Sequence, residues 1–387
     1  MQYDSVRLAD FSYVPKESKR GEIDLPFLLL TVVLLICGVI TVLSSSFARA
    51  YYDPGNVTGG NAAYYFIRQA IFALMGIAAM LFASRFSMDF YRRYSDHFFV
   101  LTLILLALVP IIGVKSNGAR RWLGVGSLTV QPSELAKAAV ILTFAKMICK
   151  FKGKMATFRF GILPFVLLLG IIIGLLVLEP HFSASIIIIA IGGVMLFLGG
   201  VRLGWFAAAF SAAAGGLIVL LTFFPYASER ITTWRDPFSN SSDEGYQIIQ
   251  SLYSIGSGGL SGVGFGASRQ KFLYLPEEHN DFIFSVLCEE LGFIGATAVL
   301  LLFALLILRG YWIALHAADR YSFLVCAGVT SLLAIQVFLN VAVVTNLVPC
   351  TGISLPFFSY GGTALILQLG EMGLILSVSR DIIIERK

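Results

Sequence analysis

Charged residues are scarce in this sequence. Only 13% of its 387 residues are Asp, Glu, Lys or Arg, and 57% are hydrophobic, whereas about a quarter of the residues of a soluble domain are charged. The scarcity excludes a soluble enzyme and a nucleic-acid-binding protein, and it predicts an all-α polytopic membrane protein. The length therefore indicates a number of membrane spans rather than a number of soluble domains.

Other features are absent as well. The five cysteines show no metal-ligand spacing, so we expect them to be small core residues without a disulfide. No small-residue cleavage site follows the first apolar run, as it would after a signal peptide. Without internal repeats or low-complexity tracts, the chain is predicted to hold one transmembrane domain (25–379) between cytoplasmic tails at 1–24 and 380–387.

Apolar runs long enough to cross about 30 Å of hydrocarbon recur along the chain. Together with one weakly apolar run, they predict ten transmembrane helices, at residues 25–43, 64–84, 98–114, 133–149, 160–178, 182–198, 203–224, 282–308, 321–345 and 360–379. One long polar segment, 225–280, separates spans 7 and 8. We expect 115–132, which mixes charge with large apolar groups, to lie at the membrane interface.

The distribution of Lys and Arg sets the orientation. With the N-terminal tail inside, about 18 of the 28 Lys and Arg residues fall on the cytoplasmic side, as the positive-inside rule requires. Both termini are then cytoplasmic, and 225–280 becomes a large extracellular loop. The acidic stretch at its end, 277–281, therefore faces the outside of the membrane.

That acidic stretch is the strongest candidate for chemistry. Asp281 stands at the water end of a span, where partial desolvation raises the pKa of a carboxylate towards that of a general base. The alternative is a helix N-cap, for which Asp is also preferred. Glu277 and His279 are candidates for assisting Asp281 or holding a divalent cation. Helical phase puts Glu289 and Glu290 on other faces, where we expect them to bind neighbouring helices.

Cations on the predicted outer side are candidates for binding an anion. Glu134 and Lys137 lie three apart in the fourth span, which fits either an intrahelical ion pair or a lysine that reaches an anionic ligand. Further cations, Arg120, Arg121, Arg230 and Lys271, form an outward basic set suited to phosphate oxygens. The glycine-rich 256–266 lacks the ending of a phosphate-binding loop and is predicted to be a re-entrant or interfacial segment.

Several long motifs resemble those of one family. They are residues 126–137, Glu179-Pro180, Arg230 with Asp236-Pro237, 245–266, 275–284, 289–292, Thr351-Gly352 and 355–362. In this order they are similar to the SEDS family of bacterial peptidoglycan polymerases, and the similarity runs from the first predicted span to the last. Residues 271–276 resemble the FtsW/SpoVE division and sporulation branch more than the RodA branch.

The resemblance implies a ten-span glycosyltransferase of the bacterial plasma membrane. Such an enzyme polymerises lipid II on the outer face, with undecaprenyl diphosphate leaving, for septal wall synthesis in division or sporulation. The expected partners are a class B penicillin-binding protein and other divisome proteins. No organic cofactor is expected, and a divalent cation (Mg²⁺ or Mn²⁺) is an alternative to protein cations for the diphosphate.

The resemblance also assigns roles to residues. The family's essential aspartate falls on Asp281, and substrate-binding positions fall on Glu134, Lys137, Arg230 and Ser359, beside the candidates Arg120, Lys271, Glu277 and His279. Three positions depart from the usual pattern: His181 replaces an acid, Asn280 replaces a threonine, and Glu371 adds an acid in the last span. Two other functions stay open, a lipid II flippase with a polar path across the membrane and a non-catalytic divisome scaffold.

Overall fold

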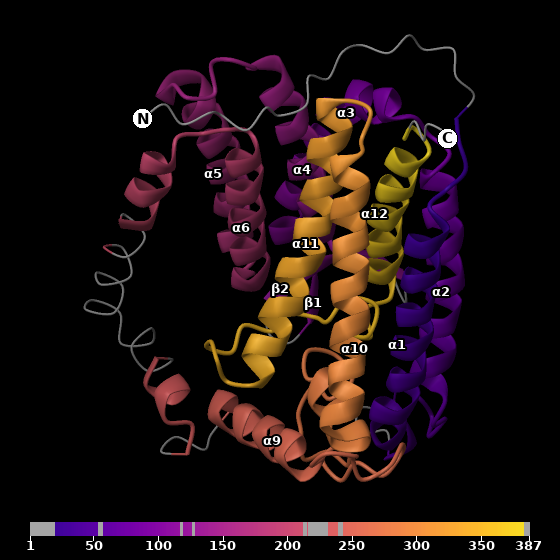
Figure 1. Ribbon diagram of the computed structural model, residues 1–387. Helices are drawn as coiled ribbons and strands as arrows, with labels where there is room; N and C mark the ends of the chain where they lie inside the picture. The colour runs from indigo at the N-terminus through magenta and orange to yellow at the C-terminus, as the bar shows by residue number, and fades with distance from the viewer. Residues whose placement is uncertain are drawn as a thin grey trace, which may run out of the picture.

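The structure is a computed structural model that describes residues 20–52, 57–116, 119–125, 128–211, 215, 231–238 and 243–382. Helices dominate it, and most of them run side by side (Figure 1). They are α1 (Leu25–Tyr52), α2 (Tyr64–Ala83), α3 (Met88–Ile112), α4 (Pro132–Lys150), a π-helix (Phe158–Ile162) leading into α5 (Leu163–Leu178), α6 (Phe182–Leu198), α9 (Asp243–Ser257), α10 (Ile283–Leu315), α11 (Arg320–Val344) and α12 (Thr363–Ser379).

The predicted helical membrane protein is confirmed at this level. Within the described ranges, six helical segments are long and apolar enough to cross a membrane, and α6 and α12 are shorter apolar helices. The predicted seventh span, 203–224, lies largely outside the described residues. The count of ten spans, with both termini cytoplasmic, therefore stays a prediction.

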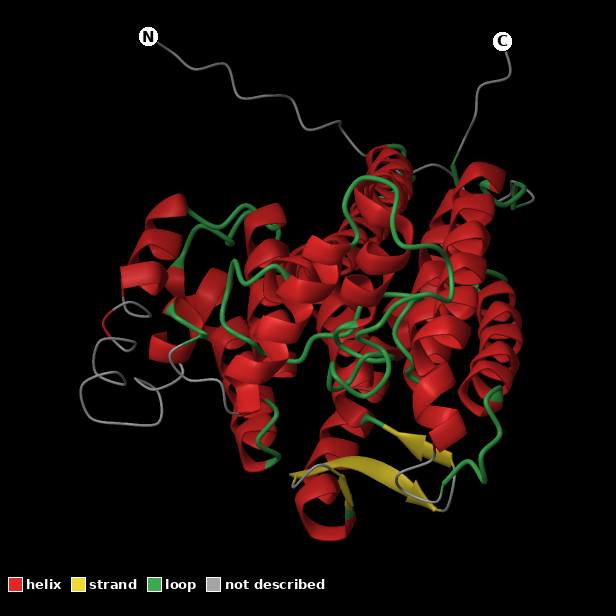
Figure 2. Ribbon diagram, turned by 90° about the horizontal axis from the view of Figure 1, so that it is seen from below, coloured by secondary structure: helices red, strands yellow, loops and turns green. Residues whose placement is uncertain are grey.

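The expectation of purely helical structure is wrong for residues 114–130. Strands β1 (Val114–Ser116), β2 (Ala119–Val125) and β3 (Leu128–Val130) pair antiparallel in the order β1-β2-β3. Figure 2 shows them together at one edge of the helical bundle. The segment mixes charge with large apolar groups, and a strand places neighbouring side chains on opposite faces.

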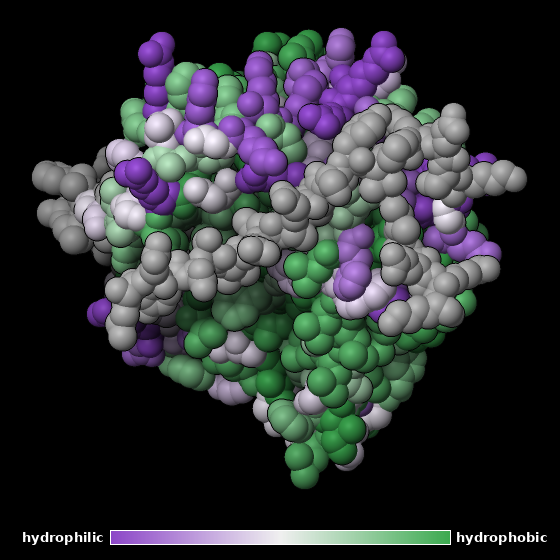
Figure 3. Space-filling view, turned by 45° about the horizontal axis from the view of Figure 1, so that its top comes forward, coloured by the Kyte–Doolittle hydropathy of each residue, from purple (hydrophilic) through white to green (hydrophobic). Residues whose placement is uncertain are grey.

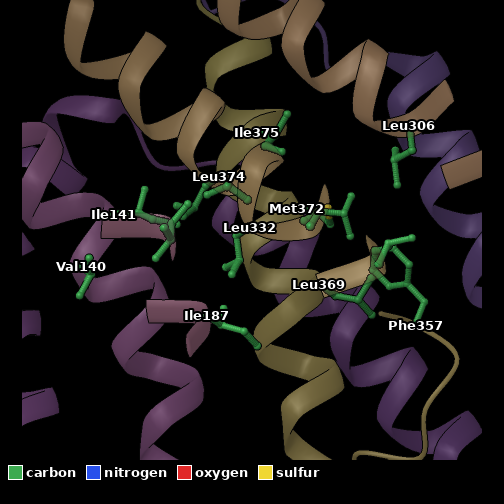
Figure 4. Packing of buried hydrophobic residues seen from close by; sticks show 14 of the residues in the cluster. Val140, Ile141, Ile187, Leu306, Leu332, Phe357, Leu369, Met372, Leu374 and Ile375 are labelled. Carbon is green, nitrogen blue, oxygen red and sulfur yellow. The ribbon is translucent and has the colours of Figure 1, made fainter. Parts of the chain in front are cut away.

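The core lies where α4, α6, α11 and α12 meet. Ile141, Ile187, Leu332 and Leu374 from these four helices are buried close together (Figure 4). α11 runs through the middle of the bundle in Figure 1, and Phe338 is its one exposed large hydrophobic residue. None of the five cysteines forms a disulfide.

The two ends of the described chain meet on one side. Arg20 Nε donates to Asp381 Oδ1 at 2.9 Å, and Gly21 N–H donates to the Arg380 carbonyl at 2.8 Å. Hydrophilic side chains gather at this end of the molecule, with a largely hydrophobic surface below it (Figure 3). This amphipathic arrangement fits a membrane protein whose termini share one side.

α10 is interrupted at Gly292. This residue has φ 65° and ψ −168°, so the helix breaks there, and only glycine adopts that backbone region at little cost. The glycine-rich segment packs directly on the break: Val263 and Gly264 N–H groups donate to the Glu289 and Glu290 carbonyls at 3.0 and 3.1 Å. The broken helix thus keeps its backbone groups paired inside protein, as a membrane requires.

Candidate active site

A polar cavity of about 290 Å³ lies among strand β2, the first turns of α4 and α6, and the segment that precedes α10. Its walls bring together acids and cations that are far apart in the sequence. The charged side chains that line it are Arg121, Glu134, Lys137, Glu277 and Asp281. The cavity therefore joins the predicted acidic stretch to part of the predicted basic set.

Asp281 does not cap α10. The N-cap position is occupied by Phe282, and no side chain caps this helix. Among the described residues, none donates a hydrogen bond to the Asp281 carboxylate, which opens into the cavity. The capping interpretation is therefore wrong, and the carboxylate is available to a substrate.

The surroundings of Asp281 make it more basic than an ordinary aspartate. Burial by neighbouring protein atoms raises the pKa of Asp281 to about 6, and the negative charge of Glu277 raises it further, against the opposing effects of His279 and Arg121. A carboxylate with such a pKa is ionised at neutral pH, yet it accepts a proton more readily than an ordinary aspartate.

The backbone around Asp281 is held from two sides. Asn340 Nδ2 on α11 donates to the Asp281 carbonyl at 2.8 Å and to the Ile353 carbonyl at 2.7 Å. Gly352, with φ 58°, lies so close that an added Cβ would be 3.1 Å from Asp281 Oδ2. Both contacts tie the 351–354 segment to the acidic stretch, and the hydropathy of the sequence gave no sign of them.

Ser359 supports this segment from behind. Its hydroxyl donates to the Asn280 carbonyl at 2.8 Å and accepts from the Leu355 N–H at 2.7 Å, while the Tyr360 N–H donates to the His279 carbonyl at 2.9 Å. Ser359 does not line the cavity. Its contacts make it a residue that positions the 279–281 backbone, not the substrate-binding residue that the resemblance implies.

Glu277 lies beside Asp281 in the cavity wall. Its φ of 54° is in the left-handed region that non-glycine residues rarely adopt, and Asn280 Nδ2 donates to Glu277 Oε2 at 2.5 Å. The turn at 277–280 therefore bends the chain so that two carboxylates, of Glu277 and Asp281, face one space. Glu277 is thus placed where it can act on Asp281, and its assisting role stays a prediction.

His279 does not line the cavity. Its ring is only 5% exposed, and its Nδ1 lies 3.6 Å from Glu278 Oε1. Glu278 in turn receives two hydrogen bonds from Arg49 of α1, at 2.8 and 3.0 Å. His279 thus belongs to a buried cluster that fastens the acidic stretch to α1, and we assign it no contact with substrate.

Glu134 and Lys137 form the predicted intrahelical ion pair and also line the cavity. The Lys137 Nζ to Glu134 Oε2 distance is 2.7 Å, and the lysine side chain is only 3% exposed. The ion pair therefore does not prevent Lys137 from contacting a ligand in the cavity. Glu134 also lines a second cavity.

The second cavity is an apolar groove of about 380 Å³ between α2, α3, α4 and α12. Its walls are almost entirely apolar and aromatic, except for Ser95, Glu134 and Glu371. Because Glu134 belongs to both walls, the polar cavity and the apolar groove adjoin at this residue.

Arg121, not Arg120, faces the polar cavity. Arg120 Nη1 donates to the carbonyls of Pro110 and Ile111 at the end of α3, at 3.0 and 3.2 Å, and does not line the cavity. Arg121 points the other way and donates to the Pro180 carbonyl at 2.6 Å. Neighbouring residues of a strand point to opposite faces, so predicting the strand would have separated the two arginines.

Lys271 is also outside the cavity. It is 2% exposed, and its Nζ donates to Glu290 Oε1 at 2.9 Å and Ser44 Oγ at 3.0 Å. The structure therefore places Lys271 in a buried ion pair that joins α1, α10 and the segment before it. The prediction that it contacts an anionic ligand finds no support here. Arg230 lies outside the described residues.

The turn between α5 and α6 completes the cavity wall. His181, which the sequence analysis noted only as a departure from the family pattern, lines the cavity, and its Nε2 lies 3.4 Å from Gln131 Nε2. Burial raises the pKa of the neighbouring Glu179 to about 8, although the charge of Arg121 opposes the rise.

The donor set does not fit a metal site built by protein alone. Within the described ranges, no group of three or more His, Cys, Asp and Glu side chains is placed to hold a metal ion. Glu277 and Asp281 offer two carboxylates, so waters or substrate phosphates would have to complete the six ligands of Mg²⁺. The divalent cation stays a prediction, and no step below is routed through it.

Comparisons with known proteins agree with this architecture. The FtsW/RodA/SpoVE family model, described as "Cell cycle protein", matches residues 25–382. "Stage V sporulation protein E" of Bacillus subtilis is 40% identical over 368 residues, which cover 94% of this chain and 98% of that protein. A "Probable peptidoglycan glycosyltransferase FtsW" of Geobacter is 37% identical over 362 residues, 92% and 96% of the two chains.

Solved structures match over nearly the whole chain. RodA of Thermus thermophilus has a TM-score of 0.68 at 28% identity, covering 93% of this chain and 97% of that one. A chain from a peptidoglycan synthase complex, studied for its coordination of polymerization and crosslinking, has a TM-score of 0.76 at 27% identity, covering 93% and 98%.

Proposed function

The chain belongs to the FtsW/RodA/SpoVE family of cell cycle proteins, and on that premise we propose that Asp281 is the general base of its reaction. The protein is a multi-pass enzyme of the bacterial plasma membrane, a peptidoglycan glycosyltransferase for division or sporulation wall synthesis. Lipid II is the proposed substrate, and the polar cavity is the proposed site of polymerisation.

The reaction uses the carboxylate and the cations that line the polar cavity. Asp281 accepts the proton of a sugar 4-hydroxyl as its oxygen bonds to the anomeric carbon of the lipid-linked donor. The bond from that carbon to the diphosphate oxygen breaks, and undecaprenyl diphosphate leaves with the electron pair. One base and a separate anion-binding wall suffice for this inverting displacement, which needs no second carboxylate as nucleophile.

The observation that carries the proposal is the state of the Asp281 carboxylate. Within the described ranges no hydrogen bond holds it, it opens into a cavity that also contains cations, and its pKa is raised to about 6. A carboxylate serving only as a helix cap or an ion-pair partner would be engaged by those contacts. Glu277 tunes its basicity, and Glu134 holds Lys137 in the wall.

The apolar groove gives the polyprenyl chain a place beside the reaction. It opens between α2, α3, α4 and α12 and adjoins the polar cavity at Glu134. A lipid substrate could then keep its chain in an apolar environment while its headgroup lies in the polar cavity.

The flippase alternative requires polar groups across the full depth of the membrane. The polar residues that such a path would use are Glu179, Gln336, Asn340, Gln368 and Glu371, but the groove beside Glu371 is almost wholly apolar. Asn340 and Gln336 lie near the polar cavity or in its wall. The distribution of polar groups among the described residues therefore favours polymerisation.

The partner is proposed to be a class B penicillin-binding protein, together with other divisome proteins. The support is the match to a chain of a peptidoglycan synthase complex. Such a partner would supply the crosslinking that a polymerase site alone does not.

Reconstitution separates the candidate functions. The purified protein, with and without a class B penicillin-binding protein, is incorporated into vesicles that contain fluorescent lipid II, and both glycan length and leaflet distribution are measured. Glycan polymer formed in the presence of the partner supports the proposal. Movement of lipid II between leaflets without polymer under any condition would favour the flippase, and neither activity would favour the scaffold.

A further inference from the structure

The first turn of α6 leaves three backbone donors unused at the polar cavity. No described residue accepts a hydrogen bond from the N–H groups of Phe182, Ser183 and Ala184, and no side chain caps this 17-residue helix. Ser183 and Ala184 line the cavity, and the first turn carries no acidic residue. A free helix N-terminus attracts anions through these donors and the helix dipole.

Arg121 stands beside this helix end without an ion-pair partner among the described residues, and Asp281, in the same cavity, is the charged group that acts on it most strongly. Arg121 donates to the Pro180 carbonyl, the Arg121 Nε has no acceptor, and no carboxylate lies within ion-pair distance among the described residues. The neighbouring Glu179 does not cancel its charge, because a carboxyl group whose pKa is about 8 is mostly protonated at neutral pH. Arg121 therefore offers its charge to the cavity, where Lys137 has already been paired with Glu134.

His181 is the second, independent sign of a ligand. It is the N-cap residue of α6, lines the cavity at only 8% exposure, and has a buried Nδ1 without a hydrogen-bond partner. Burial, and then the charges of Arg121 and Lys137, lower the pKa of His181 to about 3. The imidazole is thus neutral at neutral pH, and it adds no charge to the cavity wall.

We propose that the N-terminus of α6, Arg121 and His181 form the subsite that binds the diphosphate of the lipid-linked donor. This inference rests on the proposed function for its substrate, and it divides the polar cavity into two ends. The diphosphate lies at the α6 end and the attacking hydroxyl at Asp281. The leaving group and the base are then on opposite sides of the anomeric carbon, as an inverting displacement requires.

Binding of farnesyl diphosphate to the full-length protein in nanodiscs tests the subsite without turnover. Arg121→Ala is expected to raise the Kd about tenfold or more, because a charge-assisted contact is lost, and His181→Leu about threefold or more. Arg120→Ala is the matched control: the adjacent arginine faces α3, so its removal should change the Kd less than twofold. Equal losses for the two arginines, or wild-type Kd values for Arg121→Ala and His181→Leu, would overturn the assignment.

Two further binding measurements identify the ligand and separate the diphosphate subsite from the proposed role of Asp281. Farnesyl diphosphate should bind at least tenfold tighter than inorganic diphosphate, and the reverse order would show a site for free anions instead. Asp281→Asn should bind farnesyl diphosphate at least as tightly as the wild type while losing polymerisation. If Arg121→Ala and Arg120→Ala had equal Kd values while the wild type still polymerised lipid II, only the diphosphate subsite would be wrong. If the wild type formed no polymer with its partner, the proposed function itself would be wrong.

Discussion

At the scale of the residue, Asp281 depends on its neighbours for its chemistry. From the sequence it was either a base or a cap, and local chemistry alone did not separate the two. The structure excludes the cap, because Phe282 occupies the N-cap position of α10. Asn340 holds the Asp281 backbone, and the carboxylate is left open to the cavity. The nearby charge of Glu277 has a direct consequence for the dependence of rate on pH.

The polymerisation rate should fall as pH drops through about 6. A general base works only when deprotonated, so the raised pKa of Asp281 puts the acid limb near pH 6 instead of near 4. Glu277→Gln removes a negative charge that raises this pKa, so the acid limb should move to lower pH. Initial rates of lipid II polymerisation between pH 4.5 and 8 measure both curves, and a limb that stays in place in the variant would contradict the role of Glu277.

The sequence did not show which of two adjacent arginines faces the cavity. Arg120 and Arg121 are chemically equal and adjacent, and only the strand β2 sends them to opposite sides. Segment 115–132 was expected to be an interfacial segment, so the two-residue period of a strand was not applied to it. Lys271 was similarly misplaced, since its buried partner Glu290 is 19 residues away in the chain.

At the scale of the element, hydropathy predicted most helices and missed their polar extensions. α1 was expected to end at Leu43 but continues to Tyr52, because Ser44 and Arg49 find buried partners in Glu290 and Glu278. α3 starts at Met88, ten residues before its apolar run, where Ser87 caps it. A hydropathy window predicts a loop at such polar residues, since it does not include the tertiary hydrogen bonds that their side chains form.

The buried pair of Lys271 and Glu290 should be a stability element and not a ligand contact. Lys271→Met leaves the Glu290 carboxylate buried without its cation, which costs about 3–5 kcal/mol, so the melting temperature in detergent should fall. The double variant Lys271→Met/Glu290→Leu removes both charges and should recover most of the loss. Farnesyl diphosphate affinity of the double variant should match the wild type, and a lasting loss of affinity would return Lys271 to the binding site.

The break in α10 should tolerate no side chain. At Gly292, a Cβ would lie 2.2 Å from the Gly262 backbone nitrogen, in a backbone region that favours glycine. Gly292→Ala is therefore expected to lower expression and melting temperature sharply. Gly174→Ala, in the helical α5 with open space around it, should be neutral or stabilising by about 0.5–1 kcal/mol. Similar behaviour of the two variants would contradict the packing described for the glycine-rich segment.

At the scale of the whole molecule, an apolar bundle holds two adjoining spaces of opposite character. The polar cavity and the apolar groove meet at Glu134, so a headgroup and its lipid chain can be bound by one protein at a membrane surface. The composition and the order of the motifs predicted the class of protein and the family. They could not predict the cavity, because its walls come from strand β2, the turn before α6 and the 352–361 segment.

The polymerisation rate of Asp281→Asn, measured with the class B penicillin-binding protein proposed as its partner, tests the central claim most directly. The variant keeps the size of the side chain but cannot accept the hydroxyl proton, and general base catalysis contributes about 10²–10⁴-fold. The rate with labelled lipid II should therefore fall about 100-fold or more, without a fall in melting temperature, because burial and the charge of Glu277 disfavour the ionised aspartate in the folded protein. Asp96→Asn, at an exposed aspartate paired with Lys146, should polymerise as the wild type does. If Asp281→Asn formed glycan strands within twofold of the wild-type rate, Asp281 would not be the base.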